Sequence, residues 1–215
     1  MISFPLFLNR KNKIWVGLLW SFVASVLYLT SNHNPIFEPK FLNMWWIDSA
    51  TPFIPQTIWI YASEIPFFLT VYFLSKNLEN TNKYLYAFFF LQLVSVAIFV
   101  IYPTTYPRDL FPLTEKLDPF TFSLFGSLRV TDAPTNCLPS LHVSSCYLSS
   151  FVFLKEQQKK FPLFFIWASA IAISTLTTKQ HYIIDVIVGF LMAVVFYWIF
   201  YRCVKYKKAK YFYEN

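Results

Sequence analysis

Glycine and charged residues are scarce in this chain. Only 3 of its 215 residues are glycine, which leaves no Walker loop and no Rossmann fingerprint. Charged residues make up 13%, against about 25% in a typical soluble domain, and hydrophobic residues reach 56%. The composition therefore indicates a membrane protein, and it implies no nucleotide, flavin or metal cofactor.

Cysteine is also scarce, and its placement argues against a disulfide framework or a zinc site. Cys137, Cys146 and Cys203 form neither a CxxC pair nor a zinc-binding spacing. The formal net charge is +7, but the basic residues flank apolar runs instead of forming one continuous basic face. That arrangement orients membrane helices, so we expect no nucleic acid partner.

Apolar runs long enough to cross a membrane recur along the chain. Each approaches the length of about 20 residues that a hydrocarbon layer of about 30 Å requires. We predict six transmembrane helices, at residues 14–31, 56–75, 83–102, 138–154, 162–178 and 181–202. The sequence therefore predicts an all-α, polytopic membrane protein whose helices form one bundle, with residues 1–215 as a single domain.

The distribution of Lys and Arg predicts how this bundle is oriented. Most of them lie in residues 1–13, 76–83, 155–161 and 202–215. The alternate connections mix acidic and basic residues; they are 32–55 and 103–137. By the positive-inside rule, both termini are cytoplasmic and the two long loops lie on the opposite face. We expect an integral protein of a bacterial plasma membrane, with those loops on the periplasmic or extracellular side.

Two ionisable residues stand at the start of the last apolar run, where such groups are costly. His181 and Asp185 are four residues apart, so on a helix they share one face. A carboxylate in that position accepts the Nδ1 proton of the imidazole and leaves Nε2 free to attack or to accept a proton. The alternative is a polar pair that only joins two helices.

Two further clusters contain groups that suit a phosphate. In the segment 136–144, Pro139 is typical of a helix start, and Ser140 and the first free backbone N–H groups there form an anion site. His142 lies in that first turn and can act as a general acid. Arg108 follows the third apolar run, as either a phosphate clamp or an interfacial anchor.

The predicted topology brings the three clusters to one membrane face. Arg108 follows the third span, His142 opens the fourth and His181 opens the sixth. A cation, a helix N-terminus and two histidines on one surface are suited to phosphoryl transfer without a metal.

These clusters resemble the type 2 phosphatidic acid phosphatase superfamily, which includes the vanadium haloperoxidases. Its signatures are K-x6-R-P, P-S-G-H and S-R-x5-H-x3-D. Here the second reads Pro139-Ser140-Leu141-His142. The third begins at Ser174-Thr175 and continues through His181 to Asp185. The motif-bearing part is residues 102–189, and the resemblance implies a bundle of the same kind.

The chain departs from these signatures at the phosphate-binding cations. Ile101 stands where the first motif has its lysine, and Thr175 where the third has its arginine. Leu141 replaces a glycine, although its backbone N–H can still donate. Because a phosphate dianion needs more than one cationic donor, we predict Lys179 as a substitute, with Arg129 and Lys116 as the alternatives. The departures themselves resemble the branch of inositol phosphorylceramide synthases and sphingomyelin synthases, which carries T-x-Q-H-Y-x-x-D.

The resemblance implies a role for each residue. His181 attacks phosphorus and forms a phosphohistidine, and Asp185 orients it. His142 protonates the leaving oxygen and then activates the acceptor. The phosphoryl oxygens are held by the substrate-binding group, which comprises Arg108, Ser140, the Leu141 amide and, by our own hypothesis, Lys179.

Three functions are open at this point. The first is a metal-independent lipid phosphate phosphohydrolase on the non-cytoplasmic face, with a membrane lipid phosphate as substrate. The second is a lipid head-group phosphotransferase with the same catalytic residues. The third is a carrier or channel that uses His181, Asp185 and Glu64 without covalent chemistry. A metal held by the two histidines and one carboxylate is a further alternative.

Overall fold

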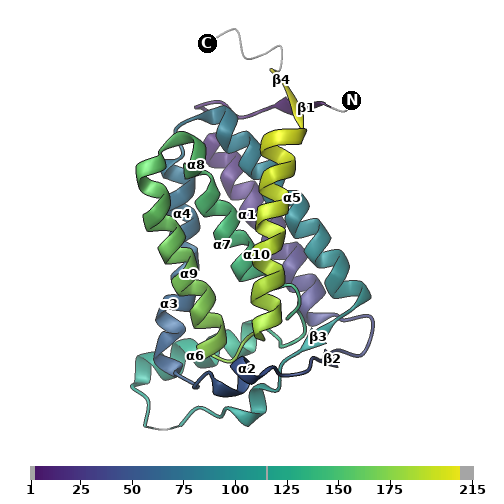
Figure 1. The fold of residues 1–215 in the computed structure, drawn as a ribbon, viewed down its shortest axis with the longest axis vertical. Helices are drawn as coiled ribbons and strands as arrows, with labels where there is room; N and C mark the ends of the chain where they lie inside the picture. The colour runs from purple at the N-terminus through teal and green to yellow at the C-terminus, as the bar shows by residue number, and fades with distance from the viewer. Residues whose placement is uncertain (1–2, 115, 209–215) are drawn as a thin grey trace.

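The computed structural model describes residues 3–114 and 116–208, and it is dominated by long helices (Figure 1). Four of them are continuous: α1 (Lys13–His33), α5 (Leu78–Ile101), α9 (Phe161–Thr177) and α10 (Ile183–Trp198). Another run is divided into η1 (Pro55–Thr57), α3 (Ile58–Ala62) and α4 (Glu64–Leu74). Pro66 has no N–H to donate to the carbonyl of Ala62, which explains why α3 ends there.

Within the described residues, five helical stretches are long and apolar enough to cross a membrane. They are Lys13–His33, Pro55–Leu74, Leu78–Ile101, Gln158–Thr177 and Ile183–Cys203. These confirm the all-α polytopic membrane class and five of the predicted spans. The third starts at Leu78, five residues before the prediction, because the Asn77 side chain caps the helix by accepting from Asn80 N at 3.0 Å.

The predicted span 138–154 is different, and the count of six is not confirmed. It forms α7 (Leu141–Phe151) and the start of α8 (Phe153–Glu156), and the short η3 (Gln158–Lys160) then leads into α9. The 11 residues of α7 extend about 16 Å, roughly half of a hydrocarbon layer. Nine of them, Val143 to Phe151, are buried, since α4, α5, α9 and α10 pack around them. It is therefore the central helix of the bundle.

The two ends of the bundle carry different short elements (Figure 1). At one end, β1 (Ser3–Leu6) pairs in parallel with β4 (Lys205–Lys208), which follows the π-helical turn η4 (Ile199–Cys203). At the other end lie α2 (Trp46–Ala50), α6 (Pro119–Thr131) and the parallel pair β2 (Lys40–Phe41) and β3 (Thr104–Thr105). Of the predicted basic segment 202–215, the residues beyond 208 lie outside the described part.

A close helix contact fixes where α7 begins. The first residues of α7 pack against α10 at Gly189, where an added Cβ would lie 2.6 Å from the carbonyl oxygen of Ser140. Only glycine allows the two backbones to approach this closely. The chain segment before α7 therefore enters the bundle, and α7 starts in its interior.

Candidate active site

The turn between α9 and α10 places His181. Gln180 N donates to Thr175 O at 3.0 Å and Lys179 N to Leu176 O at 3.1 Å, the hydrogen-bond pattern of a Schellman motif. Lys179 occupies the left-handed position of this motif with a φ of 56°. His181 N also donates to Thr175 O, at 3.3 Å. Thr175, which stands where the resembled signature has an arginine, thus accepts through its carbonyl two of the hydrogen bonds that hold this turn.

His181 is held through one ring nitrogen. Its Nδ1 lies 3.0 Å from the carbonyl oxygen of Cys137 and 3.3 Å from Asp185 Oδ2. Because both partners are acceptors, Nδ1 carries the proton and Nε2 keeps its lone pair. Asp185 Oδ2 also accepts from Tyr182 N at 2.9 Å, so the carboxylate is fixed at the first turn of α10. The contact predicted from the four-residue spacing is present, although His181 itself precedes the helix.

His142 has a carboxylate partner of its own. Its Nδ1 hydrogen-bonds to Glu64 Oε2, and its Nε2 hydrogen-bonds to the hydroxyl of Tyr61. Both partners flank Ser63, where the α3–α4 run is interrupted. The break in this run therefore turns a carboxylate and a phenol toward the first turn of α7.

The two histidines face one another across the start of α7 and the start of α10. Their ring centroids are 5.9 Å apart, at an interplanar angle of 70°. A reacting atom needs to lie about 3 Å from both a nucleophile and an acid. This separation gives one phosphoryl group access to both rings.

Arg108 is buried, with 8% of its surface exposed, and it is paired with Asp132. One guanidinium nitrogen lies 3.0 Å from Asp132 Oδ2, and another donates to the Asp132 carbonyl. Asp132 Oδ1 accepts from the hydroxyl of Tyr28, whose ring centroid is 6.3 Å from that of His142. Among the described residues no group accepts from Arg108 Nε. The guanidinium therefore belongs to the same buried cluster and keeps one donor unused.

The N-terminus of α7 points toward the histidines. Ser140 caps it by accepting from Val143 N at 3.4 Å, and Ser140 N donates to the carbonyl of Asp185 at 3.1 Å. The N–H groups of Leu141 and His142 have no acceptor within the described part of the chain. These two donors, at the positive end of an 11-residue helix, suit an anion.

Lys179 is bound elsewhere. Its Nζ donates to Asp48 O at 2.9 Å and to Thr51 O at 2.6 Å, and it lies 5.0 Å from the ring centroid of Phe111. Burial lowers the pKa of this ammonium, and the nearby Asp48 carboxylate opposes that shift. No hydrogen bond or ion pair among the described residues joins Lys179 to either histidine. The structure gives it a role in anchoring the α9–α10 turn to α2, and its phosphate contact stays a prediction.

Comparison with known proteins places the chain in one family. A family model described as the PAP2 superfamily matches residues 36–199, which include both histidines, their carboxylate partners and Arg108. The chain belongs to the PAP2 superfamily. No curated protein and no solved structure matches it.

One group in this PAP2 protein has the composition of a metal site. The ligand atoms of Cys137, His181 and Asp185 all lie within 4.8 Å of one another, and the three residues are buried. Metal binding requires the thiolate, however, and burial raises the pKa of the Cys137 thiol well above its ordinary value. The three residues are therefore better suited to holding His181 by hydrogen bonds than to binding a metal ion.

Two residues of the PAP2 site escaped prediction as partners. A carboxylate inside an apolar run predicts that Glu64 is paired within the bundle or faces the cleft, but nothing in the sequence indicates that its partner is His142. Asp132 gave no signal, because it lies in a polar loop where carboxylates are ordinary. Glu64 is identified only by its hydrogen bond to His142, and Asp132 only by its ion pair with Arg108.

Proposed function

We propose that this PAP2 protein is a metal-independent lipid phosphate phosphohydrolase acting through a phosphohistidine on His181. The observation that carries the proposal is the pair of imidazoles 5.9 Å apart, each with Nδ1 held by a carboxylate. In this arrangement His181 attacks through Nε2, and His142 exchanges a proton through its own Nε2 when a substrate oxygen takes the place of the Tyr61 hydroxyl.

The reaction proceeds in two displacements. His181 Nε2 attacks phosphorus, the bond from phosphorus to the lipid oxygen breaks, and His142 gives its proton to that oxygen. Water then attacks the phosphohistidine, His142 takes the water proton, and the P–N bond breaks to release phosphate. Asp185 stabilises the positive charge that His181 carries in the intermediate. The Leu141 amide and Arg108 Nε supply donors to the phosphoryl oxygens.

A head-group phosphotransferase is the second candidate. It uses the same residues, with an alcohol in place of water. The observation that favours it is the stretch Thr178-Lys179-Gln180-His181-Tyr182, which continues to Asp185 and resembles the inositol phosphorylceramide and sphingomyelin synthase branch. Tyr182 also donates through its hydroxyl to Thr105 O at 3.0 Å, which links this stretch to the segment before Arg108.

A phosphoenzyme assay tests the mechanism. Purified protein is mixed with labelled lipid phosphates in EDTA, quenched in alkali and analysed for phosphohistidine. We expect label in the wild type, no label in His181→Ala, and loss of phosphate release by orders of magnitude. With an aryl phosphate, whose leaving group needs no proton, His142→Ala should form the intermediate and hydrolyse it slowly.

The controls separate the candidates. His33→Ala should behave as the wild type, because His33 is exposed and bonds only to the Thr131 carbonyl among described residues. Turnover that requires an added alcohol assigns the transferase. Normal phosphate release by His181→Ala contradicts the mechanism, and an unlabelled, inactive wild type favours the carrier or channel.

A further inference from the structure

An apolar pocket of about 300 Å³ extends from His142 into the bundle. One face of α1 forms a wall, because Gly17, Ser21, Ala24 and Tyr28 recur at three- and four-residue spacing. The opposite walls come from α4, α5 and the start of α7. The pocket is therefore a groove that runs parallel to the helices.

One end of this groove is the candidate active site. Glu64, His142 and Tyr28 line both the pocket and the polar cluster described above. A molecule whose phosphate lies between the two histidines thus has a continuous apolar surface beside it. A lipid whose phosphate lies in the polar cluster would therefore place its chain along this surface.

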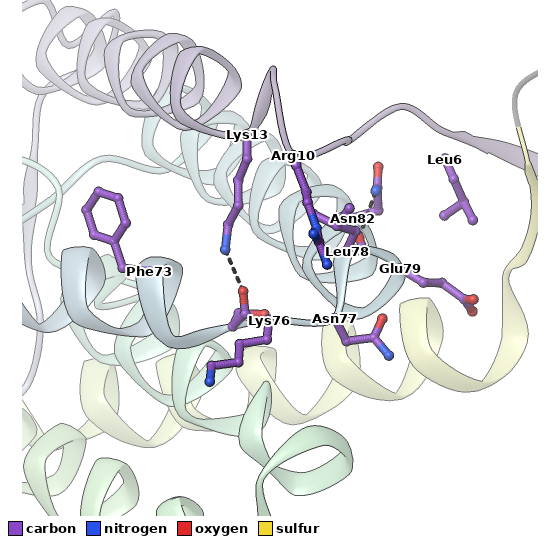
Figure 2. Close-up of a pocket in the computed structure, with 10 residues that line it drawn as sticks. Leu6, Arg10, Lys13, Phe73, Lys76, Asn77, Leu78, Glu79 and Asn82 are labelled. Carbon is purple, nitrogen blue, oxygen red and sulfur yellow. Dashed lines mark hydrogen bonds between the residues drawn. The ribbon is translucent and has the colours of Figure 1, made fainter. Parts of the chain in front are cut away.

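Tyr72 narrows the other end of the groove. A Cβ at Gly17 would lie 2.6 Å from a ring carbon of Tyr72, so the ring crosses directly against the α1 backbone. The Tyr72 hydroxyl donates to Lys13 O at 2.6 Å. The Lys13 ammonium donates to the Ser75 carbonyl, and Figure 2 marks this bond with a dashed line at Lys13. Beyond this ring lies a second cavity of about 630 Å³, lined in part by Arg10, Lys13 and Lys76. The Tyr72 ring therefore narrows the groove at Gly17, and of the lining residues on α1 and α4 only Ile14 and Phe73 lie further toward this end.

The groove opens sideways between α1 and α4. On α1, Ile14 and Leu18 are each 56% exposed, and on α4, Leu69 and Phe73 are 52% and 59% exposed. All four also line the pocket. Apolar side chains that are exposed along a membrane span face lipid, so a chain can reach the groove from the bilayer.

The dimensions fit one hydrocarbon chain. From Tyr28 to Gly17, α1 advances about 16 Å, close to the half-thickness of about 15 Å that one leaflet's chains occupy. A volume of about 300 Å³ lies at the lower limit of ligand pockets. We propose that the groove holds a single acyl or alkyl chain of the substrate, and that Tyr72 against Gly17 limits its length. This inference rests on the proposed function.

Chain-length profiles test this assignment. Phosphate release is measured with single-chain alkyl phosphates of increasing length, in mixed micelles at a fixed surface concentration. For the wild type we expect kcat/KM to rise by up to about fourfold per methylene until the chain reaches Tyr72, and then to stop rising. Tyr72→Ala should move the optimum to longer chains, and Ser21→Phe, which fills the groove midway, should move it to shorter ones.

Two controls keep the result specific. Leu19→Phe adds the same ring on a part of α1 that does not line the groove, and it should keep the wild-type optimum. Tyr72→Phe keeps the ring that narrows the groove and should also keep the optimum. The readout is the chain-length optimum of each variant and not its total rate. A partly unfolded variant loses rate at every chain length, so it does not imitate a shift of the optimum.

Three outcomes overturn the assignment. If the wild type releases phosphate with an optimum that neither Tyr72→Ala nor Ser21→Phe moves, the chain lies elsewhere and the proposed function stands. If a co-purified phospholipid stays bound in the groove throughout turnover, the groove is a structural lipid site. If the wild type releases no phosphate and forms no phosphohistidine with any chain length, both proposals fail.

Discussion

At the scale of single residues, the two histidines differ in what surrounds the ring. His181 is 6% exposed and its Nδ1 is held between a carbonyl and a carboxylate, so the ring is fixed through Nδ1. His142 lies between a carboxylate and a phenol, and an adjacent carboxylate stabilises an imidazolium. The first environment suits a nucleophile and the second suits a proton donor.

Glu64→Gln tests whether Glu64 positions and supports His142. The amide can still accept from Nδ1, but it does not stabilise the imidazolium, so proton donation to the leaving oxygen should weaken. We expect kcat for an alkyl phosphate to fall by about 10²-fold. An aryl phosphate, which needs little protonation, should lose much less.

The alkyl-to-aryl rate ratio is the informative measurement, because a merely structural defect lowers both rates together. Glu79→Gln is the matched control, since Glu79 forms an exposed ion pair with Lys83 at 2.7 Å. An equal loss for both substrates in Glu64→Gln would show that Glu64 acts only on folding.

Sequence reasoning found the residues that local spacing and motifs define. His181 and Asp185 are four residues apart, and His142 opens a predicted helix. The partners Glu64 and Asp132 are separated from His142 and Arg108 by 78 and 24 residues. No spacing rule applies to such pairs, because only the packing of helices brings them together.

At the scale of helices and turns, the site depends on how closely α7 and α10 approach. Ser140 N donates to the carbonyl of Asp185, so the first turn of each helix is tied to the other. Gly189 lies one helical turn further along α10 and faces Ser140 and Val143. A shift of either helix therefore changes the distance between the two histidines.

Gly189→Ala should destabilise the protein and reduce its activity. The new Cβ would meet the Ser140 carbonyl oxygen at 2.6 Å, and backbone cannot move away as a flexible side chain can. Overpacking of this kind costs about 1–3 kcal/mol. Thermal unfolding in detergent and phosphate release are the measurements.

Gly126→Ala is the matched control for this substitution. It lies within α6, and an added Cβ would have no neighbour within 4 Å. Replacing an open helical glycine removes backbone entropy from the unfolded chain, so this variant should be slightly more stable. A Gly189→Ala protein as stable and active as Gly126→Ala would contradict the assigned contact.

Hydropathy predicted the lipid-facing helices well, because their length and composition are set by the bilayer. It did not describe α7, whose 11 residues are mostly enclosed by other helices and include Ser144, Ser145, Ser149 and Ser150. Those hydroxyls bond to carbonyls one turn earlier, such as Ser149 Oγ to Ser145 O at 2.6 Å. A helix that is surrounded by other helices does not need the length that the hydrocarbon layer requires. A hydropathy window does not detect whether a helix is surrounded in this way.

At the scale of the whole molecule, the bundle has two unlike ends. The β1–β4 pair lies at one end, and α2, α6, β2 and β3 lie at the other, beside the turn that carries His181 (Figure 1). The proposed function requires the second end to face the periplasm or the outside. Basic segments flanking the first end predict the same orientation.

The cysteines of the chain make this orientation measurable. Cys203 is exposed near β4, whereas Cys137 and Cys146 are buried. A membrane-impermeant maleimide should therefore label Cys203 in inverted vesicles and leave it unlabelled in sealed spheroplasts. Cys203→Ser should remove that labelling.

Leu110→Cys, at a position 69% exposed just after β3, should label in spheroplasts instead. If the maleimide reaches Cys203 in spheroplasts, the histidines open to the cytoplasm, and a substrate in the outer leaflet is ruled out.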